Sequence, residues 1–100
     1  MILNTSFARE LAAHLLDINA VVLRPRDPFT WTSGWNSPIY CDNRLTLRFP
    51  EIRNKIENEF TSIIKEKFAD VDVITGTATA GIPHAAWVAS NLNKPMAYVR

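Results

Sequence analysis

The sequence lacks most of the features that would assign it to a special class of protein. Cys41 is its one cysteine, so no intrachain disulfide can form, as is typical of proteins in a reducing compartment. No apolar run approaches the length of a transmembrane helix. With 11 basic and 10 acidic residues the net charge is +1, and this balance indicates neither a nucleic acid nor a membrane partner. Because Met1 to Glu10 also lack the basic-then-apolar layout of a signal peptide, we expect a cytoplasmic protein.

The glycine-rich motifs of nucleotide-binding proteins are missing too, since neither the Walker pattern nor GxGxxG occurs. What the chain has instead is VDVITGTATAGIPH, from Val71 to His84. The run Val71–Ile74 predicts a buried strand, the small residues after it predict a loop, and Pro83 suits the first turn of a helix. This arrangement leaves backbone N–H groups open at the end of a strand, where anions bind in open α/β sheets. The segment predicts a cradle for phosphate or pyrophosphate, with a plain β–α turn as the alternative.

The composition is that of an ordinary globular chain, with 47% hydrophobic and 21% charged residues. A length of 100 residues suits one small domain. The second half predicts a strand–helix–strand unit made of Val71–Ile74, Ile82–Leu92 and Met96–Val99. Two parallel strands cannot bury both faces of a sheet. We therefore expect the chain to be the N-terminal half of a larger α/β protein.

The first half predicts a helix followed by short strands. Asn4 or Thr5 can cap a helix that runs to about Asp17. Its apolar stripe, expected to be core or a dimer contact, consists of Phe7, Leu11, Leu15 and Ile18.

A strand is expected at Ala20–Leu23, before a break at two prolines. The runs Phe29–Thr32 and Ile39–Cys41 then predict a hairpin, whose turn begins at Ser33 and Gly34 and continues to Pro38. Its aromatic and amide groups can hold a flat, polar ring, or they can form a small aromatic core.

A second helix is predicted from Pro50, which fits its first position. Its buried stripe is expected to consist of Ile52, Ile56, Phe60, Ile63, Ile64 and Phe68. Its opposite face is predicted to be solvated and without a function, and consists of Arg53, Lys55, Glu57, Glu59, Lys65, Glu66 and Lys67. Asp70 and Asp72 follow at the start of the next strand, away from the end where ligands gather, and we interpret them as structural.

Three stretches together resemble orotate phosphoribosyltransferase, most of all the form found in Gram-positive bacteria. They are FTWTSGWNSPIYCDNR (Phe29 to Arg44), ITGTATAGIPHAAWVA (Ile74 to Ala89) and PMAYVR (Pro95 to Arg100). The resemblance implies part of a type I phosphoribosyltransferase fold, a Rossmann-like parallel sheet with flanking helices and a small hood. Residues 1–48 would then form the N-terminal helix and hood, and residues 49–100 the start of the α/β core, without the C-terminal half.

The activity that this resemblance implies is transfer of ribose 5-phosphate from phosphoribosyl pyrophosphate (PRPP) to orotate. The products are orotidine 5'-monophosphate and pyrophosphate, and the reaction belongs to pyrimidine biosynthesis. The resemblance also implies Mg²⁺ as cofactor and a homodimer with shared active sites. Two alternatives stay open: a non-catalytic relative that senses PRPP or a nucleotide, and an inactive dimerising fragment.

The hairpin matches the hood segment that contacts orotate in the family. The resemblance assigns orotate binding to Thr32, Ser33, Gly34, Tyr40 and Cys41. Many relatives have lysine at the position of Thr32, so that contact is either lost or replaced here. Of the paired aromatic positions beside the orotate ring, Tyr40 keeps the aromatic character and Cys41 does not.

The small-residue loop matches the one that meets the pyrophosphate group. The resemblance assigns PRPP binding to Thr77, Ala78, Thr79, Ala80, Gly81 and Arg100. Several relatives have lysine at the position of Ala80, so backbone N–H groups and magnesium must compensate here. Arg100 corresponds to an arginine that begins the mobile catalytic loop and binds PRPP across the dimer interface. The loop lysines and histidine would follow Arg100, so no catalytic residue and no metal ligand is expected within the chain.

Overall fold

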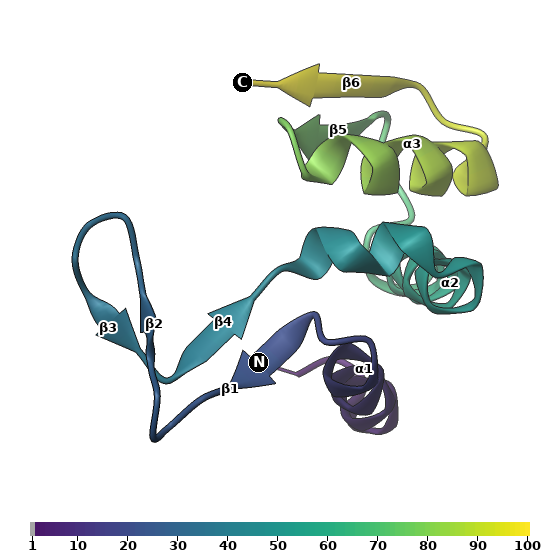
Figure 1. Cartoon of the computed structure of the whole chain (residues 1–100). Coiled ribbons are helices and arrows are strands. Elements are labelled where there is room, and N and C mark those ends of the chain that lie inside the picture. The colour runs from purple at the N-terminus through teal and green to yellow at the C-terminus, as the bar shows by residue number, and fades with distance from the viewer. Residues whose placement is uncertain (1) are drawn as a thin grey trace. The chain divides into compact units, whose positions relative to one another are not determined.

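The computed structural model of the chain describes residues 2–100 (Figure 1). They fall into two compact units, one that ends at Ile52 and one that begins at Arg53. Within the described residues, no helix has both the length and the apolar character needed to cross a membrane.

The first unit opens with α1 (Thr5–Asp17), as predicted. Asn4 is the cap, because its side-chain oxygen accepts a hydrogen bond from the Phe7 N–H at 3.1 Å. After the helix and its cap residue Ile18, Asn19 adopts a left-handed conformation with φ of 59°. The N–H of Ala20 then reaches back to the Leu15 carbonyl at 2.9 Å. In this sequence of three glycines, asparagine takes the place that glycine usually has at a helix end.

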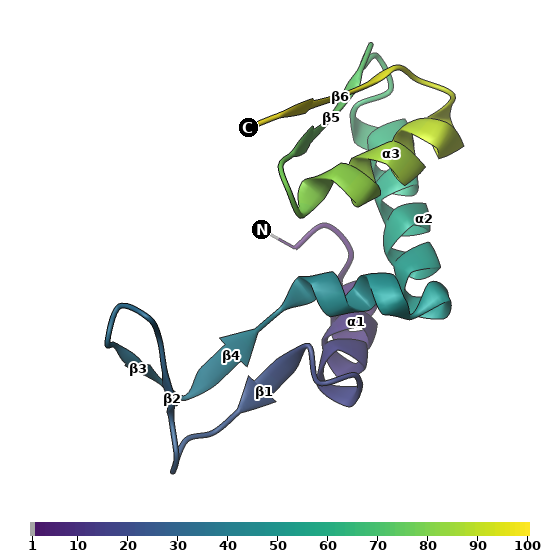
Figure 2. The same cartoon turned by 45° about the horizontal axis from the view of Figure 1, so that its top comes forward.

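Four short strands follow and form two antiparallel pairs. β1 (Val21–Leu23) pairs with β4 (Ile39–Cys41), which Figure 2 shows side by side, and β2 (Phe29–Thr30) pairs with β3 (Asn36–Ser37). The predicted pairing of the Phe29 run with the Ile39 run is therefore wrong. Pro38 separates β3 from β4 and has no N–H to continue the ladder with β2, while its carbonyl accepts from the Arg24 N–H.

A 3₁₀ helix, η1 (Asn43–Arg48), leads from β4 toward the second helix and was not predicted. Asp42 caps it by accepting from the Arg44 N–H at 3.1 Å. The Arg44 side chain also donates to both Asp42 oxygens, at 2.7 and 2.8 Å. These charge-assisted bonds lower the pKa of Asp42. The buried Thr46 hydroxyl donates to the Asn43 carbonyl at 2.7 Å, which holds the short helix together.

Helix α2 (Pro50–Lys67) begins where Pro50 predicts it, in the first unit, and continues in the second. The second unit then contains β5 (Ile74–Thr77), α3 (Gly81–Leu92) and β6 (Met96–Val99). β5 and β6 are parallel, and α3 runs along them (Figure 1). This is the predicted strand–helix–strand unit.

The first strand of this unit lies further along the chain than predicted. It begins at Ile74, whose N–H donates to the Pro95 carbonyl at 3.0 Å, and it includes Gly76 and Thr77. The strand begins at Ile74 because Ile74 lies opposite Met96, the first residue of β6. Val71 and Val73 come before this first pair and therefore lie outside the strand. The loop is correspondingly short, since only three residues separate β5 from α3.

Close packing of α3 on β5 depends on small residues. Gly76 is buried, and a Cβ atom built on it would lie 2.7 Å from the Gly81 carbonyl oxygen and 2.9 Å from the Ala85 Cβ. Ala85, Val88 and Ala89 are the buried residues of α3. The helix can therefore start directly above the end of β5 only because no side chain lies between them.

Candidate functional site

The loop between β5 and α3 leaves the start of a helix open. Ala80 is the N-cap residue of α3 and has no side-chain oxygen that could accept from the first N–H groups. The Ile82 N–H donates to the Thr79 carbonyl at 3.2 Å, and Pro83 has no N–H. The Ala78–Thr79 peptide bond is cis. An uncapped helix start at the carboxyl end of a parallel strand can bind an anion through N–H groups and the helix dipole.

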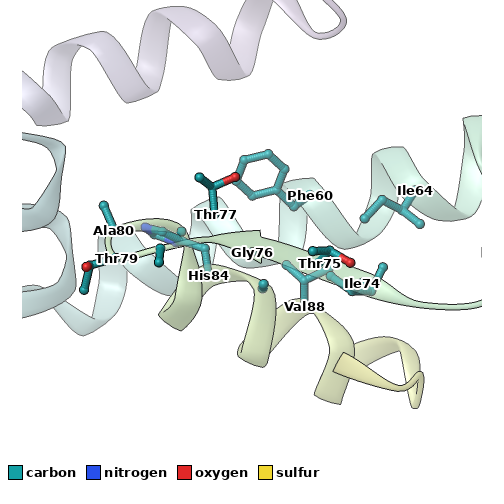
Figure 3. A pocket seen from close by; sticks show the side chains of 13 residues that line it. Phe60, Ile64, Ile74, Thr75, Gly76, Thr77, Thr79, Ala80, His84 and Val88 are labelled. Atoms are coloured by element: carbon teal, nitrogen blue, oxygen red, sulfur yellow. The ribbon is translucent and has the colours of Figure 1, made fainter. Parts of the chain in front are cut away.

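A cavity of about 460 Å³ lies against this loop (Figure 3). All five loop residues predicted to bind PRPP, Thr77 to Gly81, line it. Figure 3 shows Thr79, Ala80 and His84 gathered at one end of the cavity, and Ile64, Ile74 and Val88 toward the other. The cavity is therefore polar and backbone-rich at the loop and apolar beyond it.

A second hollow, of about 480 Å³, lies on the loop as well. It is lined by Ala78, Thr79, Ile82, Tyr98 and Arg100. The structure thus brings Arg100 to the same hollow as two residues of the loop. The Ala78 N–H donates to the Val99 carbonyl at 2.7 Å, which ties the loop to the end of β6 directly before Arg100.

Two residues of this hollow were not predicted as site residues. Tyr98 precedes Arg100 by two positions, and in an extended chain residues two apart lie on the same side. That alternation is a signal by which Tyr98 could have been found. Ile82 could be found only from the start of α3, because nothing in an isoleucine itself indicates a site.

Glu57 contradicts the prediction that its helix face is solvated. The residue is only 5% exposed, and its Oε1 atom lies 3.2 Å from Nδ1 of His84. Burial raises the pKa of Glu57 to about 7, although the charge of Arg53 opposes the shift. Burial also lowers the pKa of His84. Both shifts favour the uncharged forms, in which a Glu57 hydroxyl can donate to Nδ1. We call these two residues the Glu57–His84 pair.

Further contacts join α2 and α3 beside this pair. Nδ2 of Asn91 donates to the Thr61 hydroxyl at 3.3 Å, near the other end of α3. The Trp87 ring meets the His84 ring edge-on at 6.2 Å, and the Arg53 guanidinium lies 5.1 Å from the Trp87 ring centre. Since no spacing in the sequence relates Glu57 to a residue 27 positions away, sequence reasoning could not find this contact.

The residues predicted to bind orotate lie in the first unit. Thr32, Ser33 and Gly34 are exposed and form the turn between β2 and β3. The turn is closed by the Gly34 N–H, which donates to the Trp31 carbonyl at 2.9 Å, and Gly34 has a φ of 87°. A positive φ explains why glycine occupies this position.

Tyr40 and Cys41 are neighbours on β4, so their side chains point to opposite faces of the strand. The centroids of the Tyr40 and Phe29 rings are 5.6 Å apart. The Arg24 guanidinium lies over the Phe29 ring, 4.5 Å from its centroid. The Cys41 thiol donates to the Asn43 side chain at 3.2 Å. One flat ligand therefore cannot lie against both side chains on the same face of the strand.

Comparison with known proteins identifies relatives of this chain, although no protein-family model matches it. It is 61% identical over 92 residues to the orotate phosphoribosyltransferase of Bacillus cytotoxicus, which covers 92% of this chain and 44% of the relative. It is 62% identical over 90 residues to that of Bacillus subtilis, covering 90% of this chain and 42% of the relative. The chain thus spans less than half the length of these two relatives.

Solved structures give the same result. Orotate phosphoribosyltransferase from Aeropyrum pernix superposes with a TM-score of 0.71 at 33% identity, over 90% of this chain and 52% of its own. Leishmania donovani UMP synthase gives 0.70 at 32% identity, over 91% of this chain and 19% of its own. The predicted fold class, part of a type I phosphoribosyltransferase fold, is confirmed. The resemblance that the sequence motifs indicated is also confirmed, since nearly the whole chain is similar to part of the orotate phosphoribosyltransferases.

Proposed function

We propose that this chain supplies the orotate-facing hood and the pyrophosphate-binding loop of an orotate phosphoribosyltransferase. The reaction joins orotate to C1 of the ribose 5-phosphate group of PRPP and releases pyrophosphate. The observation that carries the proposal is identity above 60% with proteins named orotate phosphoribosyltransferase over at least 90 residues. Since those relatives are named as enzymes, the comparison does not favour a PRPP sensor or a mere dimerising fragment.

The loop and Arg100 are proposed to meet the charge of PRPP. As the bond at C1 breaks, the ribose becomes oxocarbenium-like and the departing pyrophosphate gains negative charge. Fixed N–H groups at the start of α3 can receive that charge without reorganising. Arg100 lines the hollow beside Ala78 and Thr79, and its guanidinium can hold two phosphate oxygens at once. The family resemblance further suggests that Arg100 acts in the site of the other subunit of a homodimer.

Orotate is proposed to bind the first unit through the Ser33–Gly34 turn and one face of β4. Tyr40 offers a ring that is 44% exposed, and the turn offers hydroxyl and backbone donors to a carboxylate. Cys41 faces the other side of the strand, so its assignment to the same ring contact is the weakest of the five.

Magnesium does not fit a protein-held site in the described part of the chain. Residues 2–100 contain no group of three or more His, Cys, Asp or Glu side chains placed to hold a metal ion. Neither hollow at the loop is lined by a carboxylate. Mg²⁺ is commonly held through substrate phosphates and water, so we propose that PRPP brings the ion. A cytoplasmic location remains part of the proposal.

The proposed function is tested by a spectrophotometric orotate assay on two proteins. The first is the 100-residue chain, for which we expect no orotidine 5'-monophosphate, because it spans less than half of the Bacillus relatives. The second is a chimera in which residues 1–100 replace the matching segment of the Bacillus subtilis relative, for which we expect product. Circular dichroism serves as the control that both proteins are folded. Product from the chain alone would refute the view that its site is incomplete, and a folded but inactive chimera would refute the function.

A further inference from the structure

The Glu57–His84 pair lies where it can control the pyrophosphate-binding loop. His84 is the fourth residue of α3, so it belongs to the helix turn whose N–H groups face the proposed anion. It lines the loop cavity together with Thr79 and Ala80 (Figure 3). Its Nδ1 atom lies 3.2 Å from the carboxyl group of Glu57, which belongs to α2. The contact therefore joins the first turn of α3 to a separate helix of the same unit.

Burying the Glu57–His84 pair costs free energy, which argues that the pair does more than fill space between α2 and α3. Glu57 is 5% exposed, and a buried carboxyl is tolerated only when it has hydrogen-bond partners. Two apolar residues could join α2 to α3 without that cost. A directional bond, unlike an apolar contact, fixes the ring and with it the backbone of the helix turn.

We propose that Glu57 and His84 are positioning residues, which hold the first turn of α3 and the Thr77–Gly81 loop in the geometry that receives pyrophosphate. This inference rests on the proposed function, because it assigns a role at the same loop. Neither residue needs to touch the ligand. Glu57 acts through His84, and His84 acts through the backbone of its own helix turn.

The structure offers a matched control. The Thr61–Asn91 contact joins the same two helices with a bond of similar length, 3.3 Å. Asn91 follows His84 by seven residues, which places it about 10 Å further along the helix axis, away from the loop. If the Glu57–His84 contact only holds α2 and α3 together, removing it should affect pyrophosphate binding no more than removing the Thr61–Asn91 contact does.

The test measures binding of inorganic pyrophosphate, with Mg²⁺ present, to the chimera of residues 1–100 with the Bacillus subtilis relative by isothermal titration calorimetry. Glu57→Ala leaves His84 without its partner, and we expect affinity to fall about fivefold or more. Glu57→Gln keeps a hydrogen-bonding side chain of the same size and should remain within about twofold of wild type. Asn91→Ala should also stay within about twofold, even where it lowers thermal stability as much as Glu57→Ala does.

The outcomes separate this inference from the proposed function. If the chimera without these substitutions binds no pyrophosphate, the site itself is rejected, and the inference with it. If wild type binds and Glu57→Ala binds equally, or Asn91→Ala weakens binding as much, only the positioning role is rejected.

A second measurement avoids reliance on the folding of a variant. His14 and His84 are the two histidines of the sequence, so their ring nitrogen signals can be followed separately by NMR during a pyrophosphate titration. Signals of His84 should move while those of His14, in the first unit, stay in place. An unchanged His84 at saturating pyrophosphate overturns the inference.

Discussion

Replacing Gly76 with alanine tests how closely α3 must approach β5. The added Cβ would lie 2.7 Å from the Gly81 carbonyl oxygen and 2.9 Å from the Ala85 Cβ. Ordinary contacts need about 3.5 Å, so the start of α3 must move by most of an ångström. Overpacking of this kind costs about 1–3 kcal/mol, and the stiffer unfolded chain returns about 0.5–1 kcal/mol. We expect a net loss of about 1–2 kcal/mol in the free energy of unfolding.

Gly81→Ala is the matched control, because it lies at the other side of the same contact. A Cβ there would meet its nearest atoms at 3.7 Å, which is normal packing distance. Alanine also favours the helix, so the variant should be neutral or more stable by up to about 1 kcal/mol.

Urea unfolding followed by NMR signals of β5 and α3 measures both variants in the unit that carries the change. For a domain of this size, the loss in Gly76→Ala corresponds to a fall in Tm of about 5–15 °C. Wild-type stability of Gly76→Ala, or an equal loss in Gly81→Ala, would show that the close approach of strand and helix does not set the stability of this unit.

Three further predictions concern single side chains. In the chimera with the Bacillus subtilis relative, Arg100→Ala should weaken PRPP binding by about 2–3 kcal/mol with little change in Tm, and Arg100→Lys should restore only part of it; steady-state kinetics that show equal KM for PRPP would contradict this. In the same protein, Tyr40→Ala should weaken orotate binding by about 1 kcal/mol, which corresponds to a rise of about fivefold in the KM for orotate, and it should raise the KM for PRPP less. If neither KM changes, Tyr40 belongs to the aromatic core with Phe29. The Glu57 pKa, raised from 4.5 to about 7, means that the folded state binds more protons than the unfolded state in this range, so its contribution to stability is present at low pH and is lost as pH rises from about 4.5 to about 7. The charge of Arg53 on α2 opposes the Glu57 shift, and His84, the one titratable side chain of α3, has a lowered pKa and acts in the opposite sense. Because both residues are present in wild type and in Glu57→Gln, the difference in free energy of unfolding between the two proteins, measured by urea titration, should fall across this window. A flat difference would exclude a raised pKa.

The helices and their ends could be predicted because their signals are local. Asn4 caps α1 through an N–H three residues away, and Pro50 fits the first turn of α2 wherever the helix lies in space. The parallel strand–helix–strand order follows from the same kind of pattern. The match to a phosphoribosyltransferase came from long ordered motifs rather than from periodicity.

Strand partners and buried polar groups could not be predicted, because they depend on residues distant in the sequence. Ile39–Cys41 has the β character that was expected, but its partner is β1 and not the nearer β2. Ile74 begins β5 because Met96 lies opposite it, which the apolar run before Ile74 does not show. Glu57 has the charge pattern of a solvated helix face, and only the position of His84 makes it a buried residue.

The missing cap of α3 gives a ligand a part in the stability of the protein. A helix whose first N–H groups have no side-chain acceptor is weaker at that end by about 1 kcal/mol than a capped one. An anion bound there takes the place of the cap, and it does so only in the folded state. Folding and ligand binding are then thermodynamically linked, and each tenfold rise in ligand concentration above Kd adds about 1.4 kcal/mol to the free energy of unfolding. Ala80, which leaves the helix start open, thus makes the second unit most stable when an anion that binds there is abundant.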